Sequence, residues 1–150
     1  MAREHHARAI DYEALADFRY EIRRYLHFGS QAAKAAGIDP QQYQSLLALK
    51  GLPRDARATV GALAEQMQIE HHTAVELSGR LERHGWIRRS RSGADRREVL
   101  LHLTPSGERL LAKLSLLHRG ELRTAGLRLI EALQTVITHK GKSGRNALGV

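Results

Sequence analysis

The spacing of apolar residues predicts a long helix near the start of the chain. Between residues 11 and 36, apolar side chains recur every three or four positions and so form one stripe along a helix. Gly37 can adopt the left-handed backbone conformation that ends such a helix. Gly29 and Ser30 lie in the middle of the segment, where they predict a weak point or a kink. The stripe includes Leu15, Phe18 and Ile22.

Three shorter helices are predicted between residues 40 and 84. Asp39 and Pro40 favour a helix start, because Asp caps free backbone N–H groups and Pro suits the first helical position. A second helix begins near Thr59, and after a short turn a third occupies residues 71–84. The inner face of the first is predicted to hold Tyr43, Leu46, Leu47 and Leu49, and that of the third Ala74, Leu77 and Leu81.

A β-hairpin is predicted next, because the apolar pattern changes its period. Residues 86–91 and 98–103 are typical of strands, and the turn-forming residues 92–96 lie between them. The order of helix, helix, turn, helix and hairpin within residues 40–103 is that of a winged helix-turn-helix. The fold class predicted is therefore mostly α with a small β-hairpin wing.

The C-terminal region is predicted to return to helices. Thr104 and Pro105 favour a helix start, and Gly120 and Gly126 then interrupt the pattern, so two helices are expected. A flexible basic tail is expected at residues 139–150. The apolar stripe of the last helix consists of Leu127, Ile130, Leu133 and Ile137.

Apolar stripes also run along the outer helices, residues 11–37 and 104–138. Residues 40–103 contain enough apolar residues to form a core without these stripes. These stripes could be internal core only. In a monomer, however, they would expose large apolar faces, which favours a partner chain. We therefore predict a single domain that forms a homodimer through these helices.

Composition and charge narrow the classes of function. The sequence has 150 residues and a formal net charge of +8, which indicates a polyanionic partner or merely a soluble basic protein. It contains no cysteine, which excludes disulfides, thiolate metal sites and thiol redox sensing. Its start lacks the apolar run of a signal peptide, and no segment has the apolar length of a membrane span. We expect a cytoplasmic protein with no membrane partner.

The positive charge is concentrated around the hairpin. Between residues 80 and 97 there are seven arginines and two acidic residues. Arginine suits bidentate contacts to phosphate and insertion into a narrow minor groove, so the winged helix is predicted to bind double-stranded DNA. The arginines within residues 88–91 could instead form one solvated face of a strand.

The sequence from about Tyr43 to Leu111 resembles the multiple-antibiotic-resistance regulator (MarR) family. Four short motifs in the expected order carry the resemblance. They are Leu63-Ala64-Glu65, Arg80-Leu81-Glu82 with Gly85, Asp95-Arg96-Arg97, and Leu103-Thr104-Pro105-Ser106-Gly107. The flanks also fit, since the family dimerises through its first helix and its last two helices.

The resemblance implies roles for individual residues. Residues 71–84 would be the recognition helix, with His71, His72, Thr73 and Glu76 toward base edges and Arg80 toward phosphate. In the wing, Arg97 would enter the minor groove with Asp95 orienting it, while Arg91 and Arg96 would hold backbone phosphates. The resemblance also implies a transcriptional regulator that binds a pseudo-palindromic operator and is released by a small-molecule effector.

Because of two departures from the family pattern, the DNA sequence of the operator does not follow from the resemblance. Glu76 is an acid where the family often has a neutral or basic residue, and it could accept from cytosine N4 or repel phosphate. His71 and His72 are unusual readers of bases and could be plain polar surface. Asp95 and Arg97 could likewise form only a surface ion pair, although exposed pairs stabilise a protein by no more than about 1 kcal/mol.

Other classes of function have weaker support in the sequence. Nine histidines are present, but none forms an i, i+4 pair with a nearby acid, which leaves only a metal site built by the fold. No nucleophile–base motif indicates an enzyme, and we expect no metal and no cofactor. The alternative function is a winged-helix adaptor whose basic face binds an acidic protein.

Overall fold

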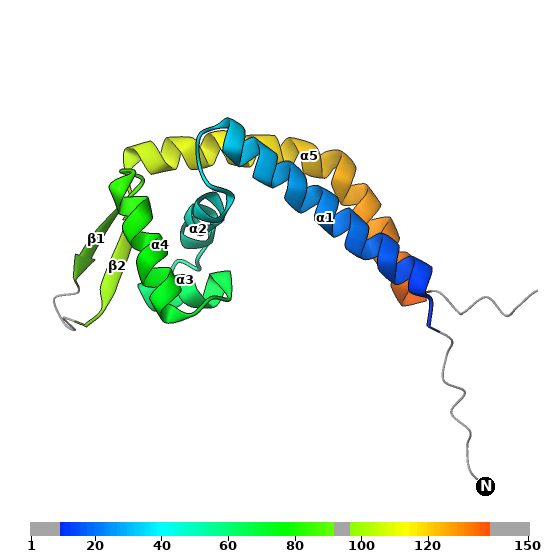
Figure 1. Cartoon of the computed structure of the whole chain (residues 1–150), viewed down its shortest axis with the longest axis horizontal. Coiled ribbons are helices and arrows are strands. Elements are labelled where there is room, and N and C mark those ends of the chain that lie inside the picture. The colour runs from blue at the N-terminus through cyan, green and yellow to red at the C-terminus, as the bar shows by residue number, and fades with distance from the viewer. Residues whose placement is uncertain (1–9, 92–96, 139–150) are drawn as a thin grey trace, which may run out of the picture. The chain divides into compact units, whose positions relative to one another are not determined.

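The computed structural model of the protein describes residues 10–91 and 97–138. It confirms the predicted fold class, since these residues form helices and one two-stranded hairpin (Figure 1). In chain order the elements are α1 (Tyr12–Ala35), α2 (Pro40–Lys50), α3 (Val60–Met67), α4 (His71–Arg83), β1 (Ile87–Arg91), β2 (Val99–Leu103) and α5 (Pro105–Thr138). The chain divides into two compact units. One comprises residues 29–118, and the described part of the other comprises residues 10–28 and 119–138.

Local capping interactions set the helix boundaries in residues 29–118, as the sequence predicts. The Asp39 carboxylate accepts a hydrogen bond from the Gln41 N–H at 2.9 Å, and Pro40 is the first residue of α2. The Thr59 hydroxyl accepts one from the Ala62 N–H at 3.0 Å and so caps α3. Gly85, which follows α4, has a φ of +75°, a conformation that glycine adopts without strain.

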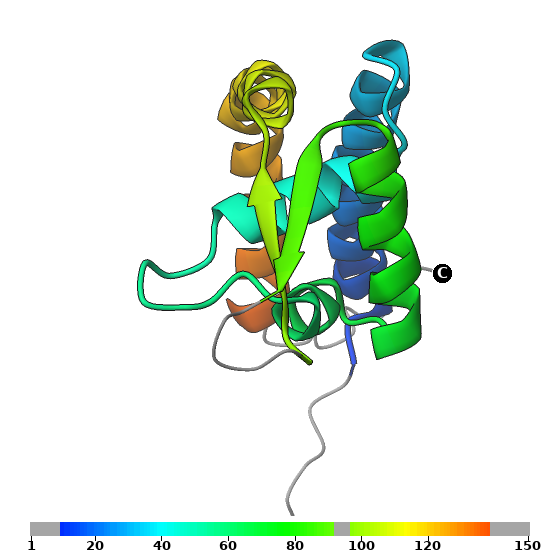
Figure 2. The same cartoon turned by 90° about the vertical axis from the view of Figure 1, so that its left-hand side faces the viewer.

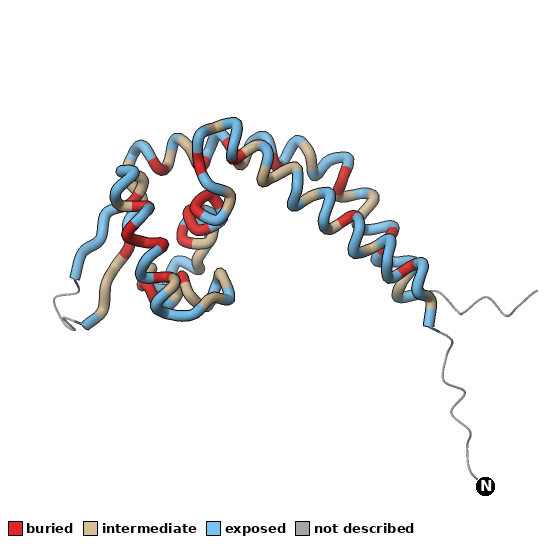
Figure 3. Tube along the Cα trace, viewed as in Figure 1, coloured by how far each residue is buried: buried red, intermediate tan, exposed pale blue. Residues whose placement is uncertain are grey.

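The core of residues 29–118 is built from every element between α2 and the start of α5 (Figure 3). Its largest fully buried apolar side chains are Leu46, Leu63, Leu81, Ile87, Leu101 and Leu114. On the inner face of α2 one predicted core residue is wrong: Leu47 is 47% exposed, whereas Leu46 and Leu49 are buried. Leu49 lies three positions after Leu46 and so shares its side of α2, whereas Leu47 points about 100° away around the helix.

The hairpin is an antiparallel pair in which Ile87 lies opposite Leu103 and Arg91 opposite Val99. β1 pairs with β2 on one side and contacts α4 on the other (Figure 2). The Leu101 N–H also donates to the Ala58 carbonyl at 2.7 Å, which ties β2 to the segment before α3. The hairpin is therefore attached to the helices at its base.

The start of α5 fits closely against the turn between α4 and β1, which explains the Thr-Pro-Ser-Gly motif at residues 104–107. The Thr104 hydroxyl donates to the Gly85 carbonyl at 2.6 Å and accepts from the Gly107 N–H at 3.1 Å. The Thr104 N–H donates to the Trp86 carbonyl at 3.0 Å. A Cβ on Gly107 would collide with that same Trp86 carbonyl oxygen. Residue 107 must therefore be glycine.

We expect Gly107→Ala to destabilise the protein by roughly 3 kcal/mol, because the clash is with backbone and cannot be relieved by a rotamer change. In a thermal melt the midpoint should fall by about 6–12 °C. Gly120→Ala is the matched control in the same helix, since nothing lies within 4 Å of a Cβ there. It should stabilise the helix by about 0.5–1 kcal/mol. Equal effects of the two substitutions would contradict this account of the motif.

Both long helices are continuous, although the sequence predicts a weak point or a kink in the first and an interruption in the last. α5 runs from Pro105 to Thr138 through Gly120 and Gly126, so the prediction of two helices is wrong. α1 likewise runs through Gly29 and Ser30. A glycine within a helix costs only about 1 kcal/mol, and flanking residues that form helices well outweigh it.

The unit of residues 10–28 and 119–138 buries little apolar surface in a single chain. Its buried residues are three alanines and Glu21, and the Glu21 carboxylate is ion-paired with Arg128 at 3.3 Å. The larger apolar residues stay accessible: Phe18 and Ile22 are half-buried, and Leu15, Leu127, Ile130, Leu133 and Ile137 are exposed. Among residues 10–91 and 97–138, fourteen large hydrophobic residues are exposed, and ten of them lie in this unit. It is therefore the described unit with the most apolar surface left for a partner to bury.

Candidate nucleic-acid interface

The outer face of α4 carries most of the residues expected to read DNA. Ala74, Leu77 and Leu81 are buried beneath it, as predicted from the helical spacing. The predicted contact residues on α4 lie as follows: His71, His72, Glu76 and Arg80 are exposed, and Thr73 is half-buried. Val75, which was not among the predicted contact residues, is 41% exposed on the same helix. Its position four residues after His71 is the signal that could have placed it on this face.

The wing residues expected to bind DNA are only partly described. Arg91 ends β1 and Arg97 lies in the turn before β2, and both are exposed. Asp95 and Arg96 lie outside the described residues. The assignment of Arg97 to the minor groove, and of Asp95 to orienting it, stays a prediction.

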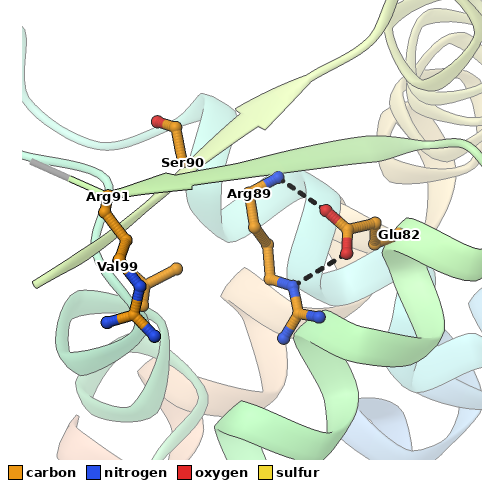
Figure 4. Close-up of a pocket in the computed structure, with 5 residues that line it drawn as sticks. All are labelled: Glu82, Arg89, Ser90, Arg91 and Val99. Carbon is orange, nitrogen blue, oxygen red and sulfur yellow. Dashed lines mark hydrogen bonds and ion pairs between the residues drawn. The ribbon is translucent and has the colours of Figure 1, made fainter.

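Strand geometry divides the basic run at residues 88–91 between two faces of the hairpin. Figure 4 shows Arg89 and Arg91 on one side of β1 and Ser90 on the other. Successive side chains of a strand alternate, so Arg88 belongs to the face of Ser90. On that face the Ser90 hydroxyl lies 3.1 Å from Nε2 of His102. The run therefore presents two of its three arginines, Arg89 and Arg91, on the same face.

An ion pair between α4 and β1 holds one of these arginines in place. The Glu82 carboxylate accepts the backbone N–H of Arg89 at 2.8 Å and the Nε–H of its guanidinium at 3.0 Å (Figure 4). The hydrogen bond from the Arg89 backbone is the main cause that lowers the pKa of Glu82. Partial burial opposes this shift, and the hydrogen bond and charge of the Arg89 guanidinium lower the pKa further. Glu82 therefore stays ionised at neutral pH. This pair was not predicted from the sequence, in which Glu82 and Arg89 are only two of the charges in a basic segment.

Comparison with known proteins places this architecture in a family. The MarR family model matches residues 36–98. The HTH-type transcriptional regulator YsmB of Bacillus subtilis (strain 168) is 30% identical over 103 residues, which cover 66% of this chain and 68% of that protein. The chain belongs to the MarR family. A putative transcriptional regulatory protein for the hcr operon of Thauera aromatica is also 30% identical, over 64% of this chain, but the match spans only 56% of that protein.

Solved MarR-family structures share the winged-helix fold of this chain. AbsC of Streptomyces coelicolor superposes with a TM-score of 0.69 at 20% identity, covering 83% of this chain and 87% of AbsC. A mutant of MepR of S. aureus, solved bound to an oligodeoxyribonucleotide, gives a TM-score of 0.62 at 23% identity and covers 86% and 94% of the two chains. At these identities the comparison establishes the fold.

In this MarR-family chain, α4 and β1 line a basic groove, which we call the α4–β1 groove. Its larger part has a volume of about 430 Å³. A neighbouring part of about 320 Å³ follows β1 toward the wing (Figure 4). The lining residues of the two parts are Val75, Glu76, Gly79, Arg80, Glu82, Arg83, Arg89, Ser90, Arg91 and Val99. Four arginines face two glutamates, so the groove favours an anion.

No metal site is found in the MarR-family domain within residues 10–91 and 97–138, where no three His, Asp or Glu side chains gather to hold an ion. The buried His118 is engaged otherwise: its ring stacks on Tyr43 at 4.7 Å between centroids, and its Nδ1 lies 2.6 Å from the Leu114 carbonyl oxygen. Within the described part of the chain, no helix has the length and apolar character to cross a membrane.

Proposed function

We propose that this MarR-family chain is a sequence-specific transcriptional regulator that binds double-stranded DNA as a homodimer. The observation that carries the proposal is the exposed polar face of α4 beside a groove lined by four arginines. A helix fits the major groove, where each base pair presents a distinct pattern of donors and acceptors. The DNA-bound MepR mutant supports the proposal by its shared fold.

In this proposal α4 is the recognition helix of a winged helix-turn-helix at residues 40–103. His71, His72, Thr73 and Glu76 face base edges, and Arg80 binds a phosphate. The accessibility of these side chains, apart from the half-buried Thr73, supports the assignment. Glu76 can accept a hydrogen bond from the exocyclic amine of cytosine, which would select G·C pairs at its position.

The wing contributes the second set of contacts. Arg97 enters the minor groove, with Asp95 orienting its guanidinium, and Arg91 and Arg96 bind backbone phosphates. The exposure of Arg91 and Arg97 at the free end of the hairpin supports these roles. Arginine is the side chain best suited to a narrow minor groove, whose negative potential it matches.

The homodimer forms through the outer helices, residues 11–37 and 104–138. Its interface includes the apolar residues that a single chain leaves accessible, namely Leu15, Phe18, Ile22, Leu127, Ile130, Leu133 and Ile137. Two-fold symmetry would present two copies of α4 to a pseudo-palindromic operator. A small-molecule effector releases the dimer from DNA, and the absence of cysteine from this sequence excludes release by thiol oxidation.

Selection from a random duplex library tests the function. We expect an enriched inverted repeat whose half-sites are about one helical turn apart, since each protomer supplies one α4. In a gel shift, the selected duplex should bind more tightly than a scrambled duplex of equal length at both low and high salt. Failure to bind any duplex at low salt would contradict the proposal and favour an adaptor for an acidic protein.

A further inference from the structure

The proposed function constrains where the DNA backbone must pass. If α4 lies in a major groove and the hairpin tip in the adjacent minor groove, one sugar–phosphate strand separates them. That strand must cross the surface between α4 and β1, which is the α4–β1 groove. The side chains of this groove are therefore candidates for phosphate contacts that neither the helix face nor the wing tip provides.

Two guanidinium groups approach the same position in the groove, beside Gly79. A Cβ built on Gly79 would lie 3.5 Å from Nη1 of Arg83 and 3.9 Å from Nη1 of Arg89. Gly79 is buried even though it lies on the groove side of α4, because these arginines cover it. A single phosphate group over Gly79 would be within reach of both cations. The repulsion between them makes an anion at this point favourable.

Arg89 is fixed in this position by Glu82. The carboxylate accepts both the backbone N–H and the Nε–H of Arg89, so the backbone and the guanidinium of one residue are anchored together. The Nε edge is used by Glu82, and the Nη end of the fork lies toward Gly79. Among the described residues, Glu82 is the only acid within ion-pair distance of Arg89, and none lies that close to Arg83.

We propose that Arg83 and Arg89 form a clamp for one backbone phosphate over Gly79, and that Glu82 is the positioning residue that aims Arg89 into it. This inference rests on the proposed DNA binding. The clamp reads no sequence, because phosphates are the same at every base pair. It strengthens binding to all duplexes alike and sets the register of α4 against the backbone.

The salt dependence of binding to a short labelled duplex of arbitrary sequence tests the clamp. Between about 50 and about 200 mM salt, Arg83→Ala and Arg89→Ala should each lower the slope of log Kd against log salt by about two per dimer. Each should also weaken binding at least about tenfold at the lower salt. Arg88→Ala is the matched control, since it removes the same charge from the adjacent residue on the opposite face of β1. It should weaken binding less than about threefold.

The role of Glu82 is tested by whether its replacement weakens or strengthens DNA binding. Glu82→Gln removes a negative charge near DNA, and on charge alone it would strengthen binding. If Glu82 positions Arg89, the substitution must instead weaken binding, and it should add little to the effect of Arg89→Ala in the double mutant. Glu76→Gln is the control, because Glu76 lines the same groove. In binding to arbitrary duplexes Glu76 should act only as a repulsive charge, so its removal should strengthen binding.

The outcomes separate the clamp from the proposed function. If the wild-type dimer binds no duplex, the proposed function fails and the clamp fails with it. If the wild type binds but Arg89→Ala matches Arg88→Ala, only the clamp is overturned. A role of Glu82 restricted to holding the hairpin would lower the melting temperature of Glu82→Gln without weakening DNA binding. That result would overturn the positioning role. Arg89→Lys keeps the charge and is the second variant to measure if Arg89→Ala does not fold.

Discussion

Arg97→Ala is expected to weaken binding to the selected operator by about 2–6 kcal/mol per dimer, because a well-placed arginine contact contributes roughly 1–3 kcal/mol in each half-site. Fold and dimerisation should survive, since Arg97 is exposed in the turn before β2 and contributes little to the core. The measurement is the Kd for operator DNA by fluorescence anisotropy, with circular dichroism as the check on folding.

Two further variants show whether the guanidinium or only its charge matters. Arg97→Lys keeps the charge but loses the planar fork, so it should recover less than half of the lost binding energy. Asp95→Ala should lose part of the binding free energy that Arg97→Ala loses. In the double mutant it should add little to that loss, because the free-energy effects of neighbouring residues in one network are not additive. An unchanged Kd in a folded Arg97→Ala protein would remove the wing from the mechanism.

Ile130→Glu should convert the proposed dimer to a monomer. Ile130 is 55% exposed in the single chain and lies on the apolar stripe of α5 with Leu127 and Ile137. Burying a carboxylate from each protomer should destabilise the dimer by roughly 4 kcal/mol or more, about a thousandfold in its dissociation constant. At micromolar concentration, light scattering should then give 16.8 kDa, where the wild type should give twice that mass.

The control for this substitution lies on the other side of the same helix. Thr135 is exposed, and it lies five residues after Ile130, which turns its side chain well away from the stripe. Thr135→Glu should leave the dimer intact. The loss of the dimer in Ile130→Glu should also weaken operator binding, since a monomer engages one half-site. A wild type that scatters as a monomer would overturn the proposed assembly.

The sequence was sufficient to predict the helix boundaries where local chemistry sets them. Asp39 and Thr59 cap their helices through backbone N–H groups two or three residues away. Gly37 and Gly85 have the positive φ angles that end α1 and α4. These interactions are complete within about one turn of the chain, so they can be inferred without the fold.

The exposed face of α4 followed from the sequence for a similar reason. The helical period that buries Leu77 and Leu81 places His72, Glu76 and Arg80 outside. The motifs that resemble the MarR family added the expected roles, because the positions of those motifs match one known architecture.

Tertiary structure decided the features that depend on residues far apart or on the face of a strand. The separation of Arg88 and Arg89 onto opposite faces of β1 depends on the register of the hairpin, and a shift of one residue would exchange the two faces. The exposure of Leu47 and the continuity of α5 through Gly120 were likewise determined by packing and by neighbouring residues rather than by single-residue preference.

The pairing of Glu82 with Arg89 shows the limit most clearly. In the sequence both are ordinary charges in a basic segment, separated by the turn at Gly85. Only the return of β1 along α4 brings the Arg89 N–H and guanidinium to the same carboxylate and places Arg83 beside them over Gly79. Charge type and number are properties of the sequence, whereas the direction in which a charge points is set by the packing of a strand on a helix.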